Sequence, residues 1–190
     1  LYAVTVNATF KILEMARNHL VKRFIFCSTG DVFAGAPNLV GDLVTWSPPS
    51  PSESIYRPES FYGAAKAAAE LLTTAYKDTM QIAIARLYHP YGPGGERFLV
   101  NRMVQAVIEG NESSIGGPFS TVLNPIWIDD LGDGLRQLVE SQETGAFNLG
   151  GAETISVRSL LETIGTIAGH SPTIFSTPEK PGNDLVSGID

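Results

Sequence analysis

The chain has 190 residues, of which 43% are hydrophobic and 17% charged, a composition typical of a globular protein and not of a disordered or collagenous one. Its 13 lysine and arginine residues against 20 acidic residues give a net charge of −7, which argues against nucleic-acid binding. The sequence has no run of about 18 apolar residues, so no transmembrane helix is predicted. The single cysteine excludes an intramolecular disulfide.

The apolar spacing predicts alternating helices and strands. The predicted helices cover residues 4–20, 61–77, 97–109 and 156–168, and another begins at Asp129–Asp130. The predicted strands cover residues 23–27, 81–87, 125–128, 145–149 and 172–176. A stretch rich in Pro, Gly and Ser over 34–60 is predicted to be a long irregular loop. This alternation predicts an α/β fold with a largely parallel sheet.

Tyr62 and Lys66 are four residues apart in a predicted helix and therefore share one face. An ammonium group close to a phenol stabilises the phenolate and lowers its pKa, so that the phenol can exchange protons near neutral pH. A half-buried tyrosine beside a solvated lysine would give the same spacing without any catalysis. The spacing alone leaves both interpretations open.

Polar segments follow two of the predicted strands. Ser28 and Thr29 come directly after strand 23–27, and Tyr88, His89 and Pro90 come after strand 81–87. Ligands of parallel sheets bind beyond the carboxyl ends of the strands, where hydroxyl groups can hydrogen-bond a substrate. The alternative is a Ser/Thr turn that caps the next segment.

Other reactive residues have simpler interpretations. Cys27 is predicted to pack in the core, and Arg86 to make a structural ion pair within its strand. The three histidines show no metal-ligand spacing, so no metal site is expected. The absence of a basic-then-apolar leader, together with the single cysteine, favours a cytoplasmic protein.

Several segments, taken in order, resemble the extended short-chain dehydrogenase/reductases, and specifically the NAD-dependent epimerase/dehydratase family that acts on nucleotide sugars. The resemblance runs from about residue 4 to about residue 169 and lies in five segments: Ser28–Phe33 (STGDVF), Tyr62–Lys66 (YGAAK), Arg86–Gly94 (RLYHPYGPG), Asn124–Leu131 (NPIWIDDL) and Gly145–Gly151 (GAFNLGG).

The resemblance implies roles for the first two segments. Tyr62 would be the acid/base that moves the proton of a sugar hydroxyl. Lys66 would lower the pKa of Tyr62 and bind the nicotinamide ribose. Thr29, together with Ser28, would hydrogen-bond the reacting sugar oxygen.

It implies binding roles for the third segment and the turn after it. Tyr88 and Pro90 would pack against the nicotinamide ring. His89 stands where many family members place an Asn that touches the nucleotide sugar. Apart from the resemblance, Arg97 and Arg102 are candidates to face a diphosphate, and a solvated helix face is the slightly favoured alternative.

The implied architecture is the C-terminal part of a doubly wound, Rossmann-like sheet plus part of a smaller substrate-binding lobe. Residues 1–91 and 124–150 would belong to the sheet domain, and 92–123 and 151–190 to the lobe. The resemblance also implies NAD or NADP as cofactor and a homodimer. The glycine-rich phosphate loop of the family is not found, so we expect a fragment of a longer enzyme that is inactive alone.

Gly30 and Asp31 stand where the 4,6-dehydratases of the family carry an Asp-Glu pair, which argues against 4,6-dehydration. Two further functions stay open. One is an NADP-dependent carbonyl reductase that uses the same tyrosine and lysine. The other is a non-catalytic dinucleotide-binding scaffold of the same fold.

Overall fold

The computed structural model describes residues 1–33, 39–40, 43–44, 56, 58–110 and 121–169. The predicted strand 172–176 and most of the predicted loop 34–60 lie outside these residues. The chain divides into two compact units. The first contains residues 1–35, 48–87 and 132–149, and the second contains 36–47, 88–131 and 150–190.

A three-stranded parallel sheet is the centre of the first unit. Its strands are β1 (Arg23–Thr29), β4 (Gln81–Leu87) and β8 (Gly145–Leu149), in the order β1-β4-β8. All three were predicted, and β1 extends two residues further than expected, so that Ser28 and Thr29 are its last residues. Ser28 pairs with Arg86, and Thr29 with Leu87. The parallel sheet confirms the α/β prediction.

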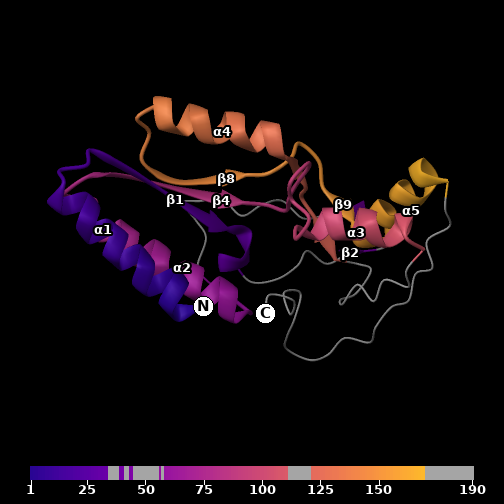
Figure 1. Cartoon of the computed structure of the whole chain (residues 1–190), viewed down its shortest axis with the longest axis horizontal. Coiled ribbons are helices and arrows are strands. Elements are labelled where there is room, and N and C mark those ends of the chain that lie inside the picture. Colours follow the sequence, from indigo (N-terminus) through magenta and orange to yellow (C-terminus); the bar gives the residue numbers. More distant parts are fainter. Residues whose placement is uncertain (34–38, 41–42, 45–55, 57, 111–120, 170–190) are drawn as a thin grey trace. The chain divides into compact units, whose positions relative to one another are not determined.

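Helices cover both faces of this sheet (Figure 1). The π-helical turn η1 (Tyr2–Asn7), α1 (Ala8–Asn18) and α2 (Phe61–Thr74) lie on one side, and α4 (Ile128–Glu140) lies on the other. The helix α2 begins at Ser60, whose Oγ accepts a hydrogen bond from the Gly63 amide at 2.9 Å. The predicted acidic start of α4 is confirmed, because Asp129 and Asp130 lie in its first turn.

The two faces of β4 build two small cores. Because side chains alternate along a strand, Ile82 and Ile84 face α1 and α2, where they pack with Ala69 and Phe26. The alternate residues Ala83 and Ala85 face α4 and pack against Leu138. The small side chain of Ala69 is fully buried, which allows α2 to lie close to the sheet.

The described residues of the second unit include short strands and the amphipathic helices α3 and α5. The strand β5 (Pro90–Tyr91) is parallel to β7 (Ile126–Trp127), β6 (Val122–Leu123) is antiparallel to β9 (Ile155–Ser156), and β2 (Leu39–Val40) is antiparallel to β3 (Leu43–Val44). The helices α3 (Leu99–Ile108) and α5 (Val157–Ala168) share a core with Leu123. The predicted ends of α5 are confirmed: Ser156 Oγ accepts from the Ser159 amide, and Gly169 is left-handed with φ +69°.

The expected division into domains grouped residues 88–91 and 124–131 with the sheet, whereas the contacts group them with the second unit. The assignment of the units to cofactor and substrate stays a prediction. Within the described residues, no helix has the length and hydropathy needed to cross a membrane. Nor do three or more His, Cys, Asp or Glu residues gather there as metal ligands would.

Candidate active site

The first unit brings the predicted Tyr62–Lys66 pair to the carboxyl end of β1. The side chain of Thr29, the last residue of β1, lies near Tyr62 and acts on the pKa of its phenol. One turn further along α2, Lys66 Nζ donates a hydrogen bond to the backbone oxygen of Cys27 at 2.9 Å. The same Nζ lies 5.9 Å from the centroid of the Tyr62 ring. Three of the predicted site residues are therefore neighbours.

Gly63 allows this close approach. A Cβ at Gly63 would collide with the backbone carbonyl of Asp31, which belongs to the 3-10 turn η2 (Gly30–Val32) directly after β1. The first turn of α2 therefore packs against the backbone of η2 with no room for a side chain. This explains why glycine follows the candidate tyrosine.

The electrostatics of Tyr62 differ from the expectation. Burial raises the pKa of the Tyr62 phenol, and the nearby Asp31 carboxylate raises it further, while the Thr29 side chain lowers it. The predicted lowering of this pKa by Lys66 stays a prediction; the Lys66 ammonium group is bonded to the Cys27 carbonyl oxygen. Burial also lowers the pKa of Lys66 itself. Tyr62 therefore holds its proton at neutral pH.

Asp31 is a site residue whose importance the sequence did not reveal. Burial raises the pKa of its carboxyl group, and the nearby Thr29 side chain acts in the opposite direction. Thr29 Oγ1 also accepts a hydrogen bond from the Asp31 amide at 3.3 Å, which caps η2. One threonine hydroxyl thus connects Asp31 and Tyr62.

Ser28 and Cys27 show how β1 presents its two faces. The Ser28 hydroxyl is buried and has no hydrogen-bond partner among the described residues. Cys27 is exposed, so the prediction of a core cysteine is wrong. Cys27 lies on the face that carries Ile25, and the apolar cluster beneath α4 includes Ile25 but ends before Cys27.

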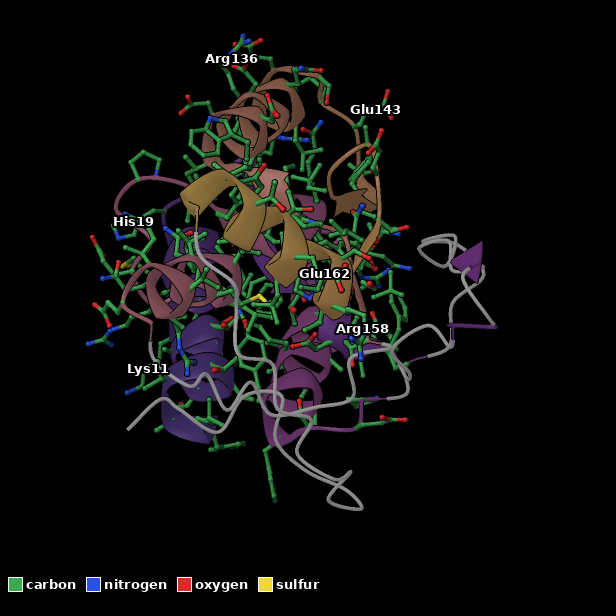
Figure 2. The ribbon with its side chains drawn as sticks, turned by 90° about the vertical axis from the view of Figure 1, so that its right-hand side faces the viewer. Lys11, His19, Arg136, Glu143, Arg158 and Glu162 are labelled. Carbon is green, nitrogen blue, oxygen red and sulfur yellow. The ribbon has the colours of Figure 1, made fainter. Side chains whose placement is uncertain are left out.

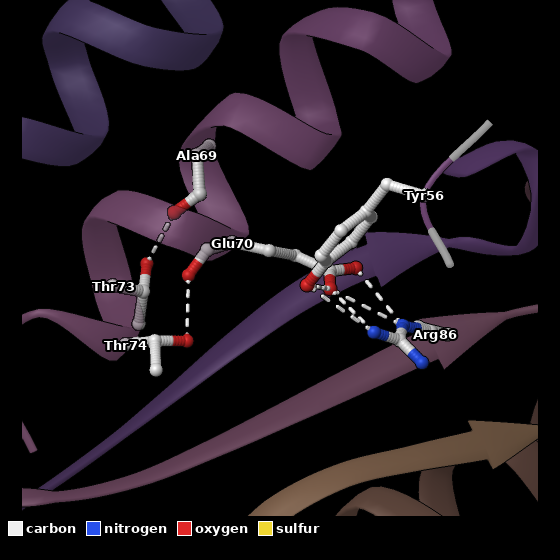
Figure 3. A network of polar contacts seen from close by, with 6 residues as sticks. All are labelled: Tyr56, Ala69, Glu70, Thr73, Thr74 and Arg86. Atoms are coloured by element: carbon white, nitrogen blue, oxygen red, sulfur yellow. Dashed lines mark hydrogen bonds and ion pairs between the residues drawn. The ribbon is translucent and has the colours of Figure 1, made fainter. Parts of the chain in front are cut away.

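Arg86 makes the structural ion pair that its place in a strand predicted (Figure 3). Its Nη2 lies 2.8 Å from Glu70 Oε2, and its Nε donates to Glu70 Oε1 at 3.1 Å. The Tyr56 hydroxyl donates to Glu70 Oε2 at 2.8 Å. Glu70 and Tyr56 were not singled out from the sequence, although Glu70 follows Lys66 by one turn of the same helix.

The second unit contains the other candidate site residues, Tyr88, His89, Pro90 and Arg97, and His89 contacts Asn124 there. His89 has a positive φ of 43°, and its Nδ1 accepts a hydrogen bond from the Asn124 amide at 3.3 Å. Burial lowers the pKa of His89 to about 4, so its imidazole is neutral at pH 7. Its neighbour Tyr88 is buried, and Pro90 begins β5.

Asn124 organises this region and was not predicted to do so. Its buried amide nitrogen Nδ2 donates to the backbone oxygens of Gly151 at 2.9 Å and Glu153 at 2.8 Å. A Cβ at Gly150 or Gly151 would collide with Asn124 or with the Pro125 carbonyl. The signal in the sequence was the pairing of Asn-Pro before one strand with Gly-Gly after another.

The glycine turn after β5 is fixed by a second asparagine. Asn101, on α3, accepts from the Gly92 amide at 3.1 Å and donates to the Gly92 oxygen at 2.7 Å. Gly92 has φ +137°, a conformation that favours glycine. Arg97 is exposed in the turn before α3, because the helix begins at Leu99 and not at the predicted residue 97.

A parallel sheet covered by helices on both faces, with polar side chains at the carboxyl end of a strand, defines a Rossmann-type α/β protein. The family model for the NAD dependent epimerase/dehydratase family matches residues 1–150. The chain therefore belongs to the NAD-dependent epimerase/dehydratase family, as the resemblance predicted.

Curated relatives fall in the same family. The chain is 27% identical to a UDP-glucuronate 4-epimerase of Thermodesulfobacterium geofontis over 169 residues, which are 86% of this chain and 49% of that one. It is 30% identical to a dTDP-glucose 4,6-dehydratase of Mycolicibacterium smegmatis over 192 residues, which cover 97% of this chain and 55% of that one. The chain thus spans about half the length of the curated relatives it matches.

Solved structures show the same fold. A Thermus thermophilus UDP-glucose 4-epimerase in complex with NAD has a TM-score of 0.75 and 23% identity, covering 96% of this chain and 60% of that one. A Streptomyces venezuelae dTDP-glucose 4,6-dehydratase with NAD bound has a TM-score of 0.80 and 23% identity, covering 97% and 56%. These likenesses confirm the Rossmann-type prediction.

Proposed function

We propose that this chain is part of an NAD-dependent enzyme that epimerises a nucleotide sugar, with Tyr62 as its acid/base. The observation that carries the proposal is the cluster at the end of β1. There the Thr29 hydroxyl lies near Tyr62, and Lys66 stands one helical turn away. A hydroxyl placed beside a phenol can orient a substrate hydroxyl for proton transfer.

Tyr62 would use both of its protonation states in one catalytic cycle. Since burial and Asp31 raise its pKa, the phenol is ready to donate a proton to an alkoxide on the sugar. To accept a proton instead, Tyr62 needs a lower pKa, which a cationic group bound nearby would provide. The oxidised nicotinamide of NAD carries a positive charge and, when bound, supplies a reversible hydride acceptor.

The residues of the first unit fit a nicotinamide ribose. Lys66 offers an ammonium group that already bonds a backbone oxygen, and Ser28 offers a buried hydroxyl that no described residue engages. Cations and hydroxyls are the groups that recognise ribose hydroxyls. NAD is favoured over NADP because solved neighbours of the same fold were crystallised with NAD.

Epimerisation is favoured over 4,6-dehydration at this site. Dehydration needs separate acid and base groups for the eliminated water, and Gly30 provides no side chain for one of them. Epimerisation needs one group that removes and returns a proton, which Tyr62 can do. The relatives include both kinds of enzyme.

The second unit would recognise the nucleotide sugar. His89 is neutral at pH 7 and would therefore act on substrate through hydrogen bonds and not through charge. Tyr88 and Pro90 would pack against the nicotinamide ring, and exposed Arg97 would face the diphosphate. The roles of His89, Tyr88 and Pro90 rest on the resemblance, and that of Arg97 rests on its charge and exposure.

The enzyme would be a homodimer. Large apolar side chains are exposed along η1, α1 and α2: Tyr2, Val4, Phe10, Ile12, Met15, Phe61 and Leu71. Exposed apolar groups concentrated on neighbouring helices favour a protein interface over solvent. Sedimentation of the natural protein would test this, and a monomer at micromolar concentration would contradict it. A cytoplasmic location remains part of the proposal.

The test of function uses the natural protein that carries residues 1–190. Released NAD after denaturation, together with interconversion of one UDP- or dTDP-sugar, is the expected result. The variant Tyr62→Phe should lose activity roughly 100-fold or more while it keeps its NAD. Unchanged activity in Tyr62→Phe would contradict the assignment. Consumption of NADPH with a carbonyl substrate would favour the reductase, and a protein that binds neither cofactor nor sugar would favour the scaffold.

A further inference from the structure

The helix α2 is fixed to the sheet at three successive turns. Tyr62, Lys66 and Glu70 follow one another at intervals of four residues and therefore share one face. Tyr62 contacts the last side chain of β1, and Lys66 contacts a carbonyl oxygen of β1. Glu70 contacts Arg86 of β4. Only the last of these three contacts lies away from the candidate chemistry.

The Glu70–Arg86 contact is almost entirely withdrawn from water. The Glu70 side chain is 0% exposed and that of Arg86 is 4% exposed. Three hydrogen bonds join the two groups, with distances of 2.8, 3.1 and 3.2 Å, while Arg86 Nη1 has no partner among the described residues. Because desolvation offsets most of the attraction in such a pair, stability alone is a weak reason for its presence.

Arg86 also contacts the segments that lead into and out of the candidate site. Its guanidinium lies 4.6 Å from the ring centroid of Phe33, which directly follows η2. It lies 5.6 Å from the ring of Tyr56, which precedes α2 and donates a hydrogen bond to Glu70. Phe33, next to η2, and Tyr56, before α2, thus both lie against the Arg86 guanidinium, and Figure 3 shows Tyr56 there.

We infer that the Glu70–Arg86 pair is a positioning device, which sets the axial register and rotation of α2 so that Tyr62 meets Thr29. This inference rests on the proposed function of Tyr62. Eight residues separate Glu70 from Tyr62, a distance of about 12 Å along a rigid helix. A slip of one residue at Glu70 would shift Tyr62 by about 1.5 Å and rotate it by about 100°.

A second link is electrostatic. The Glu70 carboxylate raises the pKa of Lys66 against the burial that lowers it, and so helps to keep that amine charged. The pair therefore positions Tyr62 and supports the ammonium group beside it. Both effects would disappear together if Glu70 lost its charge.

The test separates positioning from stability by replacing both partners with apolar residues of similar size. In the natural protein, Glu70→Leu/Arg86→Met removes the two charges together, so no buried charge is left unpaired and the fold is retained. We expect kcat to fall roughly 10- to 100-fold, while KM for the nucleotide sugar stays within about twofold because no substrate contact changes. Thermal unfolding should stay near that of the wild type.

The matched control is the exposed pair on α4. Arg136 lies 3.3 Å from Glu140, with both side chains more than half exposed, and Figure 2 shows Arg136 at the outer side of α4. The double variant Arg136→Met/Glu140→Leu should keep both kcat and KM. An equal loss in both double variants would overturn the inference.

A crystal structure of the Glu70→Leu/Arg86→Met variant supplies a readout that does not depend on turnover. Loss of the 2.9 Å contact between Lys66 Nζ and the Cys27 oxygen is expected. A preserved contact together with wild-type kcat would overturn the inference. If the wild type turns over no nucleotide sugar, the proposed function fails. The distance between Lys66 Nζ and the Cys27 oxygen in the variant then decides whether the pair positions α2.

Two milder single variants test the inference if the double variant does not fold. Tyr56→Phe removes one hydrogen bond to Glu70 and keeps the ring on Arg86, while Glu70→Gln keeps the shape of the carboxylate and removes its charge. We expect kcat to fall by about threefold or more in each, with Glu70→Gln the more affected because it loses charge-assisted bonds. Wild-type kcat in both would overturn the inference.

Discussion

Lys66 directs its ammonium group at the backbone oxygen of Cys27, 2.9 Å away, and not at the hydroxyl of Tyr62. Lys66 is therefore tied to β1 before any ligand binds, and its charge is partly satisfied there. The consequence for Tyr62 is that its pKa is set by burial and by Asp31, both of which raise it. The predictions below follow from this arrangement and from the packing around it.

Replacing Asp31 should lower the pKa of Tyr62. In Asp31→Asn the negative charge that raises the pKa of Tyr62 is gone, so the phenol should ionise at a lower pH than in the wild type. Absorbance of tyrosinate in alkaline titrations, taken as a difference against Tyr62→Phe, measures this. Asp133→Asn on α4, where the side chain is exposed, is the control. An unchanged titration in Asp31→Asn would show that Asp31 does not act on Tyr62.

The same substitution should stabilise the fold near neutral pH. Because burial raises the pKa of Asp31 in the folded state, the folded protein disfavours the charged carboxyl. The neutral carboxyl group contributes its full stability when the pH is below the pKa of Asp31 in the unfolded chain. This contribution is lost as the pH rises through the pKa of Asp31 in the folded protein. Urea unfolding from pH 3 to 7 should therefore show Asp31→Asn gaining stability over wild type as the pH rises. A constant difference would contradict the raised pKa.

Gly63 should tolerate no side chain, in contrast to another glycine in a helix. In Gly63→Ala the new methyl group meets the Asp31 carbonyl, so α2 must shift. We expect a loss of about 1–3 kcal/mol in the free energy of unfolding and a loss of activity. Gly132→Ala on α4 has open space at its Cβ and should gain up to about 1 kcal/mol from helix propensity. Chemical denaturation of both variants decides, and equal effects would contradict the close approach.

His89 should make the protein sensitive to acid. Its folded pKa of about 4 lies below the usual histidine value of 6.5, so its contribution to stability is complete above pH 6.5 and is lost as the pH falls towards 4. The loss amounts to at most about 3 kcal/mol. Urea unfolding at a series of pH values should show His89→Gln losing less stability than the wild type over this range. His19→Gln, at the exposed end of α1 (Figure 2), should behave as the wild type does.

Removal of Glu70 alone should be far more damaging than removal of an exposed partner. Glu70→Ala leaves Arg86 buried without its counter-ion, which costs about 3–5 kcal/mol of the free energy of unfolding. Glu140→Ala removes one exposed partner of Arg136 and should cost less than about 1 kcal/mol. Guanidinium denaturation of the two variants measures the difference, and similar losses would mean that Arg86 finds another partner.

Much of the fold was predictable because it depends on local spacing. The apolar runs of β1, β4 and β8 and the ends of α5 follow from side-chain alternation and from caps such as Ser156 and Gly169. The short strands β6 and β9 were not predicted, because two residues carry no periodicity. The strand expected at 125–128 is limited to Ile126–Trp127, since α4 begins at Ile128.

The placement of Tyr62 and Lys66 on one helix was predictable from the sequence, but the electrostatics of Tyr62 were not. The spacing of Tyr62 and Lys66 placed them on one face of a helix, which the structure confirms. The sign of the Tyr62 pKa shift depends on how deeply the ring is buried and on how close Asp31 lies, and neither is a property of spacing. Likewise, the contact between Asn124 and Gly151 joins residues 27 positions apart through tertiary packing.

The division of the chain into two units has a consequence for how such an enzyme can change. The groups that would handle the proton, Tyr62, Thr29 and Asp31, all belong to the first unit, while His89 and Arg97 belong to the second. Under the proposed function, changes in the second unit would alter which sugar is accepted while the acid–base groups of the first unit are kept. Chimaeras that exchange residues 88–131 between relatives and keep the first unit unchanged would therefore be a way to change substrate specificity.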